Sequence, residues 1–259
     1  MNVVASISTV RSGIPLREAL QTYALESKFE FLRVLRTPAF AVPTLLFPPL
    51  FYLLFGLLLN RGSAVQYLFA TYSVFGIMAP SLFGFGVGIA IERERGWLAL
   101  KRVAPMPPGA YLSSKLVMAM LFGLIIYVVL ATMASLFGGV SLQGGQWLQL
   151  GAIALLGVMP FCALGLLIGS RAPANAAPAF VNLIYLPMAF LSGLWMPLTM
   201  LPAFIGKIAP LWPAYHLAQL ALATIGQGDG STALPHVAAL AGFTAICFAI
   251  ARRWLARTT

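Results

Sequence analysis

Residues that could carry acid, base or charge chemistry are few in this chain, and many of them lie in one segment. Residues 91–115 hold two of the six acidic residues and five of the sixteen basic ones. Residues 92–95 alternate in sign, whereas the adjoining stretches 62–91 and 116–170 carry no charge. A charged island between long apolar runs must lie in water. It is therefore the place where this chain can meet a soluble partner through charge complementarity.

The remaining candidates for catalysis or metal binding are two cysteines and two histidines. Cys162 and Cys247 lie inside apolar runs, which predicts small packing residues and not a disulfide or a metal site. His236 by itself makes no metal site, and His216 and His236 both fall at or near the outer side. The sequence also lacks a GxxxxGK[ST] phosphate loop. We expect neither catalysis nor a bound cofactor or metal in this chain.

Composition places the chain in a membrane. Apolar residues make up 60% of it and charged residues 8%, with a mean hydropathy of +0.91, against roughly 25% charged residues in soluble domains. The apolar runs are long enough for helices to span a bilayer and do not alternate as barrel strands do. The fold class expected is an all-α polytopic membrane protein. The net charge of +10 is spread over connections between spans, which favours the positive-inside rule over nucleic-acid binding.

Two domains are predicted along the chain. Residues 1–37 form a cytoplasmic tail and an amphipathic interfacial helix that is too charged to span, suited to the membrane surface or, alternatively, to a partner. This part lacks a signal-peptide pattern, so we expect it to be retained. Residues 38–259 form the transmembrane domain, with a proline-rich re-entrant hairpin at 197–224. Its six spans are expected at 39–59, 67–91, 113–138, 147–169, 175–195 and 232–251.

Charge distribution sets the expected orientation and energy source. Fourteen of the sixteen basic residues fall on one side of the predicted topology, which places the island and both termini in the cytoplasm. The middle of each span lacks charged residues, whereas ion-driven transporters need ionisable groups near the midplane. Transport energy must then come from outside the chain. We expect the partner that supplies this energy to dock on a short helix at 92–103, with Trp97, Leu98 and Leu100 as an apolar anchor. The alternative is that this segment is a solvated loop.

Two motifs resemble the type-2 ABC exporter (ABC-2) permeases. The first is Glu92-Arg93-Glu94-Arg95-Gly96, followed by Pro105 and by Ser114-Lys115 at the start of the next span. The second, at 190–198, reads Phe-Leu-Ser-Gly-Leu-Trp-Met-Pro-Leu and is similar to the end of the fifth span in that family. Two positions depart from the family pattern, since Trp97 stands where Thr is usual and Ala99 where Glu is usual.

The resemblance implies a fold, partners and site residues. Such a permease has an interfacial helix, six spans, a cytoplasmic coupling helix (here 92–103) and an outer re-entrant hairpin. It pairs with a second permease copy or paralogue in the inner membrane, and each copy docks an ABC ATP-binding subunit that binds ATP and Mg. The residues that would couple to the ATPase are Glu92, Arg93, Glu94, Arg95, Gly96, Trp97, Leu98, Leu100, Arg102 and Pro105.

The cargo is predicted from what the spans lack. With no charge in the bilayer, a hydrophobic or amphipathic cargo such as a drug, a natural product or a lipid-linked molecule is easier to accommodate than a free anion. Polysaccharide or glycolipid export, and a non-transporting scaffold or sensor, are the alternatives. Aromatic and sulfur side chains that could line a path are Phe47, Tyr52, Phe83, Tyr185, Met188 and Phe190, although lipid contact or packing between helices is the simpler explanation for each.

Overall fold

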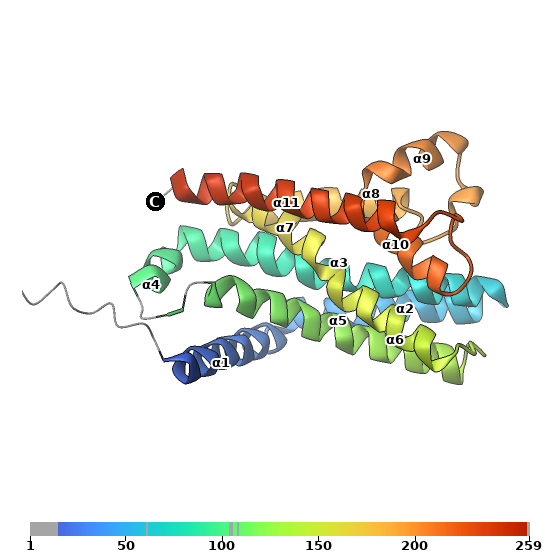
Figure 1. The fold of residues 1–259 in the computed structure, drawn as a ribbon, viewed down its shortest axis with the longest axis horizontal. Coiled ribbons are helices and arrows are strands. Elements are labelled where there is room, and N and C mark those ends of the chain that lie inside the picture. Colours follow the sequence, from blue (N-terminus) through green and yellow to red (C-terminus); the bar gives the residue numbers. More distant parts are fainter. Residues whose placement is uncertain (1–14, 61, 104–105, 108, 258–259) are drawn as a thin grey trace, which may run out of the picture.

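The computed structural model of the chain describes residues 15–60, 62–103, 106–107 and 109–257. Within these residues every regular element is helical, and the long helices lie side by side along the longest axis (Figure 1). Five segments are long and apolar enough to cross a membrane: Pro38–Leu58, Ser63–Glu94, Ala110–Leu136, Gly144–Gly169 and Ala233–Leu255. This is the architecture of a multi-pass membrane protein.

The span expected at 175–195 is shorter than the others. It corresponds to α8 (Ala177–Leu191), which is apolar but has only 15 residues. At 1.5 Å per residue this helix is about 22 Å long, less than the roughly 30 Å hydrocarbon core. Six crossings therefore stay a prediction, while five segments meet the length requirement by themselves.

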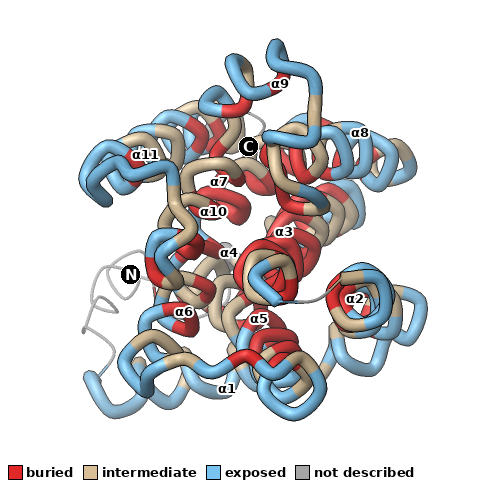
Figure 2. The backbone as a smooth tube through the Cα atoms, turned by 90° about the vertical axis from the view of Figure 1, so that its right-hand side faces the viewer, coloured by how far each residue is buried: buried red, intermediate tan, exposed pale blue. Residues whose placement is uncertain are grey.

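α3 (Ser63–Glu94) forms the centre of the fold. It is surrounded by α5 (Ala110–Leu136), α7 (Val158–Gly169) and α8 (Figure 2). α3 and α7 cross closely because glycines face each other. A Cβ added to Gly169 would lie 2.6 Å from the Gly86 carbonyl oxygen, and one added to Gly165 would lie 2.9 Å from that of Leu82. Small residues at such positions allow two backbones to approach.

Prolines lie at irregularities in two of the long segments. α6 (Gly144–Leu156) and α7 are separated at Gly157, one turn before Pro160, whose missing N–H cannot continue the helical ladder. α2 (Pro38–Phe51) contains Pro48 and Pro49 and passes into a π-helix, η2 (Tyr52–Leu58). These prolines are therefore followed by a π-helix, whose turns are wider than those of an α-helix, and the segment stays continuous.

The residues at 197–224 fold into short helices. After a 3-10 turn, η3 (Leu198–Met200), come α9 (Ala203–Ile208), a second turn η4 (Ala209–Leu211) and α10 (Pro213–Thr224). α10 packs against α3, α6 and the last helix, α11 (Ala233–Arg257). Whether this hairpin re-enters a leaflet stays a prediction.

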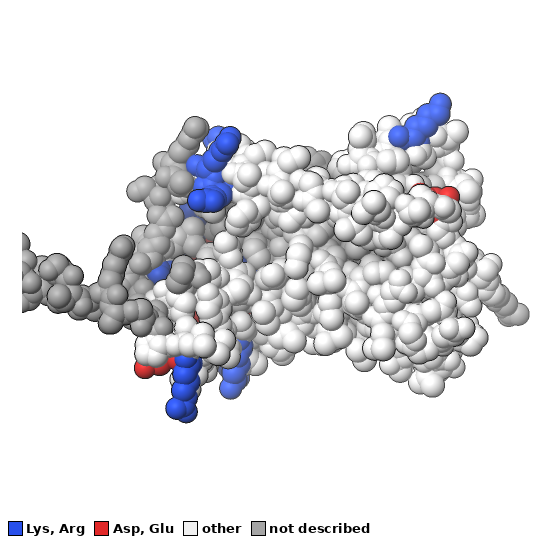
Figure 3. All heavy atoms as spheres, in the orientation of Figure 1, with Lys and Arg blue, Asp and Glu red and all other residues white. Residues whose placement is uncertain are grey.

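Charged side chains gather mostly at one end of the bundle (Figure 3). This charged end carries α1 (Leu16–Leu35), α4 (Trp97–Val103), the α7–α8 loop and the C-terminal part of α11 (Figure 1). The opposite end, here called the far end, carries α9 and the loop 225–232, with Lys207 and Asp229. The separation follows the asymmetry expected from the sequence.

Candidate functional site

The helix expected at 92–103 is divided in two. α3 continues to Glu94, and α4 begins at Trp97. Between them Gly96 has a φ of 73°, in the left-handed region that glycine enters without strain. The chain turns there, so the acidic and basic residues before Gly96 belong to the long helix and only those after it belong to the short one.

α4 presents an apolar surface to solvent. Trp97 is 40% exposed and Leu100 66% exposed. The guanidinium of Arg95 lies 5.3 Å from the centroid of the Trp97 ring. Leu98, on the other side, packs against the core. An exposed aromatic and aliphatic pair beside a cation has the composition of a protein docking site.

A cluster of four charged side chains lies at the same end; three of them are buried, and the fourth, Arg33, is 44% exposed, and we call the group the buried cluster. Lys115 Nζ is 2.8 Å from Glu30 Oε1 and 2.9 Å from Glu92 Oε1. Arg33 Nη2 is 2.6 Å from Glu30 Oε1 and 2.8 Å from Glu92 Oε1. Two positive and two negative charges balance, and the cluster joins α1, α3 and α5. Lys115 is fully buried, and charges persist in such a place when they are paired and hydrogen-bonded.

Two further contacts connect α4 to this cluster. The Tyr111 hydroxyl donates to Glu92 Oε2 at 2.6 Å. Lys101 Nζ, on α4, lies 4.9 Å from the Tyr111 ring centroid and 3.3 Å from Glu26 Oε2 on α1. α4 is therefore in contact with α1 through Lys101 and Glu26, and with α5 through Tyr111, whose hydroxyl binds Glu92 of α3.

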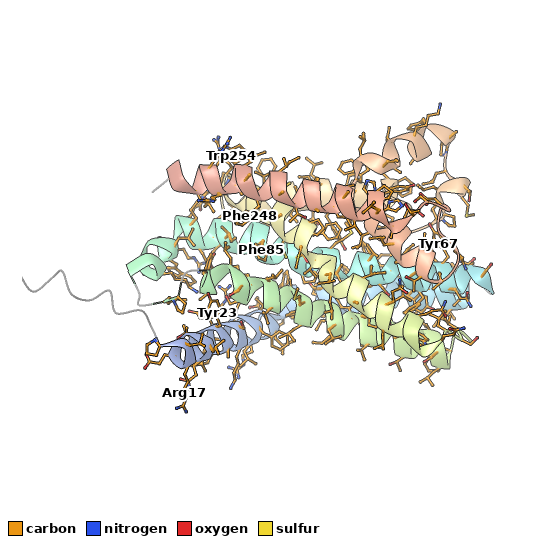
Figure 4. The ribbon with its side chains drawn as sticks, viewed as in Figure 1. Arg17, Tyr23, Tyr67, Phe85, Phe248 and Trp254 are labelled. Carbon is orange, nitrogen blue, oxygen red and sulfur yellow. The ribbon has the colours of Figure 1, made fainter. Side chains whose placement is uncertain are left out.

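The end of α3 also holds the α7–α8 loop. Arg93 donates to the carbonyl oxygens of Ser170 and Ala172, the latter at 2.7 Å. The backbone N–H of Ala174 donates to Glu94 Oε1 at 2.7 Å. Next to this loop the Arg171 guanidinium lies 4.2 Å from the ring centroid of Trp254 on α11 (labelled in Figure 4). Non-covalent contacts between side chains therefore connect the elements of the charged end, from α1 to α11.

Burial and charge act on Glu30 in opposite directions. Burial raises the pKa of the Glu30 carboxyl, but Lys115 and Arg33 outweigh this effect and hold the pKa below its ordinary value. Glu30 is therefore a carboxylate at neutral pH, and it keeps the cluster neutral in sum.

The residues predicted to couple to an ATPase thus have two dispositions. Glu92, Arg93 and Glu94 bond to other parts of this chain, whereas Trp97 and Leu100 face solvent. Arg95 is exposed as well, and Gly96 makes the turn. The side chain of Arg102, and Pro105 as a whole, lie outside the described residues.

A cleft of about 420 Å³ lies between α2, α3 and α8. Its lining is aromatic and aliphatic, with polar atoms from Thr44, Asn182 and Tyr185 and no charged side chain. Three of the predicted path residues line it, namely Phe47, Phe83 and Tyr185. The cleft has the size and character of a small-molecule site.

A second cavity, of about 410 Å³, adjoins this cleft. It lies between η2, the start of α3 and the segment after α8, where the Tyr67 hydroxyl (labelled in Figure 4) donates to the Gly193 carbonyl at 2.7 Å. Phe51 and Trp195 line both cavities. Their rings stack with centroids 6.4 Å apart and planes 12° from parallel. This stacked pair separates the two spaces.

The other predicted path residues lie elsewhere. Tyr52 and Met188 are fully buried in the packed core. Phe190 packs against Trp195 with centroids 6.1 Å apart. Sequence reasoning missed Phe51 and Trp195, which share the aromatic character of their neighbours and carry no separate signal.

The buried cluster was also missed by sequence reasoning. Lys115 is the single charge at the start of a long apolar run, and Glu30 lies on an amphipathic segment. Taken separately, each position indicates only a charged residue at the edge of the membrane. Among the residues that the structure describes, no group of three or more His, Cys, Asp and Glu side chains is placed to hold a metal ion.

The fold is that of a multi-pass membrane protein whose charged end carries the short helix α4 with an exposed apolar pair. The ABC-2 family transporter model matches residues 58–253, so the chain belongs to the ABC-2 transporter family. It is similar to the "Putative transport permease YvfS" of Bacillus subtilis (strain 168). The two are 29% identical over 210 residues, which is 79% of this chain and 85% of the relative. The family in general works with an ABC ATP-binding partner.

Proposed function

We propose that this chain is the permease subunit of an ATP-driven exporter that moves a hydrophobic or amphipathic cargo outward across the inner membrane. The aromatic cleft between α2, α3 and α8 carries this proposal, because it offers rings from three helices and no charged side chain. Rings of this kind bind flat and apolar surfaces through stacking and buried area. They do not compensate the charge of a free anion, so a drug, a natural product or a lipid-linked molecule fits best.

The energy enters at α4. An ABC ATP-binding subunit, which holds the ATP and Mg, docks on the exposed Trp97 and Leu100. Its motion passes through Lys101 and Tyr111 to the buried cluster and so to α1, α3 and α5. The concentration of basic residues at the charged end supports a cytoplasmic location for this face and for both termini.

A second copy, or a paralogue, faces the cleft. α2 and α8 flank it with exposed apolar side chains, among them Leu46, Leu50 and Leu183. Pairing across this face would enclose the cleft between two chains. Polysaccharide or glycolipid export is the second candidate, since aromatic rings with Thr44 and Asn182 between them also suit sugar rings.

Co-expression with candidate ATP-binding subunits tests the docking surface. The double variant Trp97→Ala/Leu100→Ala should lose co-purification of the ATPase and ATP-dependent cargo uptake into inverted membrane vesicles. Leu136→Ala is the control for Leu100, because Leu136 is similarly exposed, at 71% against 66%, but lies at the C-terminal end of α5. If the double variant keeps both properties, α4 is not the docking site. An intact complex whose ATP hydrolysis ignores every cargo would instead indicate a scaffold or sensor.

A further inference from the structure

A second polar cluster lies at the far end, where α10 meets the start of α11. His216 Nδ1 is 2.9 Å from His236 Nδ1. His216 Nε2 is 2.9 Å from the carbonyl oxygen of Pro210, and His236 Nε2 is 2.6 Å from Ser231 Oγ. His236 is 6% exposed. Every ring nitrogen of the pair therefore has one partner, and α10 is joined to α11 through two imidazoles.

These partners fix the protons of the neutral pair. A carbonyl oxygen only accepts, so His216 carries its hydrogen on Nε2. Its Nδ1 then accepts, and the hydrogen between the two rings sits on His236 Nδ1. His236 Nε2 is left as an acceptor for the Ser231 hydroxyl. All four nitrogens are satisfied with both rings neutral.

A proton on His236 Nε2 leaves the bridge intact, because that nitrogen then donates to Ser231 Oγ and lies 3.6 Å from Asp229 Oδ2. Asp229 remains a carboxylate to face it. Partial burial raises the pKa of Asp229, but hydrogen bonds from Ser231 and Tyr215 outweigh this effect and lower that pKa to about 2.

The second proton breaks the bridge. The lone pair that accepts the bridging hydrogen bond is on His216 Nδ1, so protonation there places two N–H groups against each other across 2.9 Å. It also places two positive rings side by side. Burial, and to a lesser degree the neighbouring His236, lower the pKa of His216 from its ordinary value. The break therefore requires a lower pH than protonation of an isolated histidine would.

Few other charged groups lie around the two histidines. Asp229, from the loop 225–232, faces His236, and the exposed Lys207 lies on α9. α3 and α6 face α10 with sequence that carries no charge at this end. One contact of α10 is independent of pH in this range, since the Gln146 amide donates to the Thr224 carbonyl at 2.8 Å. Protonation thus acts on one end of α10.

We propose that His216 and His236 form a pH-sensitive latch that holds the start of α10 against α11 and releases it when both imidazoles are protonated. The proposal does not depend on the cargo or on an ATPase. It concerns the chain alone and can be tested on the purified protein.

Spin labels on Leu211 and Leu234, which are 78% and 76% exposed, report the distance between η4 and α11. They are placed in a Cys162→Ala/Cys247→Ala background in lipid nanodiscs, and double electron–electron resonance is recorded from pH 8 to pH 5. We expect one narrow distance at pH 8 and a second, wider population in acid. The ratio of open to closed should rise about tenfold per pH unit where one proton separates the states.

Matched variants identify the histidines as the cause. His216→Asn keeps an acceptor oxygen toward His236 but does not titrate, so it should show one population down to pH 5. Tyr215→Phe, one residue away, keeps both imidazoles and should retain the transition. A wild-type distribution that is identical at pH 8 and pH 5 overturns the proposal. So does an unchanged transition in His216→Asn, because the opening would then have another source.

Discussion

Lys115 Nζ and Glu92 Oε1 lie 2.9 Å apart in a place that water does not reach. Lys115 extends from α5 toward α3, where Gly88 leaves room: a Cβ at that position would lie 3.4 Å from Lys115 Nζ. The ammonium is held between carboxylates of two different helices. This pair makes the charged end a fixed junction beneath α4 and the α3–α5 connection.

Removing the cation from this junction should be costly. Lys115→Met leaves Glu30 and Glu92 with Arg33 as the remaining cation of the cluster, and breaking a buried pair in this way costs about 3–5 kcal/mol. The melting temperature in detergent measures the loss. Lys28→Met is the control, because Lys28 is exposed on α1, and it should change stability little. Equal melting temperatures for the two variants would show that the cluster does not stabilise the fold.

Stability should fall in acid through Glu30. The pKa of Glu30 is held below its ordinary value of 4.5 in the folded protein. A depressed carboxyl pKa stabilises the fold above the unfolded value, and the contribution is lost as the pH falls through the folded value. The wild-type melting temperature should therefore decline more steeply below about pH 4.5 than that of Glu30→Gln. Glu18→Gln, at an exposed site on the same helix, should follow the wild type.

Two glycine substitutions should act in opposite directions. Gly169→Ala puts a methyl group 2.6 Å from the Gly86 carbonyl oxygen at the α3–α7 crossing. Such overpacking costs about 1–3 kcal/mol. Gly242→Ala on α11 has no neighbour within 4 Å, so it should stabilise the helix by about 0.4–1 kcal/mol. Thermal unfolding of both variants checks the signs, and a neutral Gly169→Ala would mean that the two helices separate easily.

Cargo affinity should depend on the cleft and not on exposed aromatic area in general. Phe47→Ala removes a ring from the cleft lining, which should weaken the apparent affinity for an aromatic cargo roughly twofold to tenfold. Phe180→Ala removes a ring of similar exposure, 48% against 51%, from α8 outside the cleft. Concentration dependence of uptake into vesicles, or of stimulated ATP hydrolysis, measures the difference. The same weakening in both variants would place the cargo elsewhere.

The sequence by itself determined what depends on local composition. Apolar length predicted five segments that are long enough to cross a membrane, and the proline-rich stretch at 197–224 folds into short helices where a hairpin was expected. The charged island predicted an apolar anchor of Trp97, Leu98 and Leu100; Trp97 and Leu100 are exposed, whereas Leu98 packs against the core. The ABC-2 resemblance, drawn from motifs in order, is confirmed by the family match over residues 58–253.

The tertiary structure alone decided which distant residues meet. Glu30 and Lys115 are 85 positions apart, and His216 and His236 are 20 apart on different helices. The turn at Gly96 decided that Glu92, Arg93 and Glu94 bond inward while Trp97 faces outward. Helical periodicity gives the face on which a residue lies but not the helix that face will contact. That choice depends on packing, and packing is settled by the whole bundle at once.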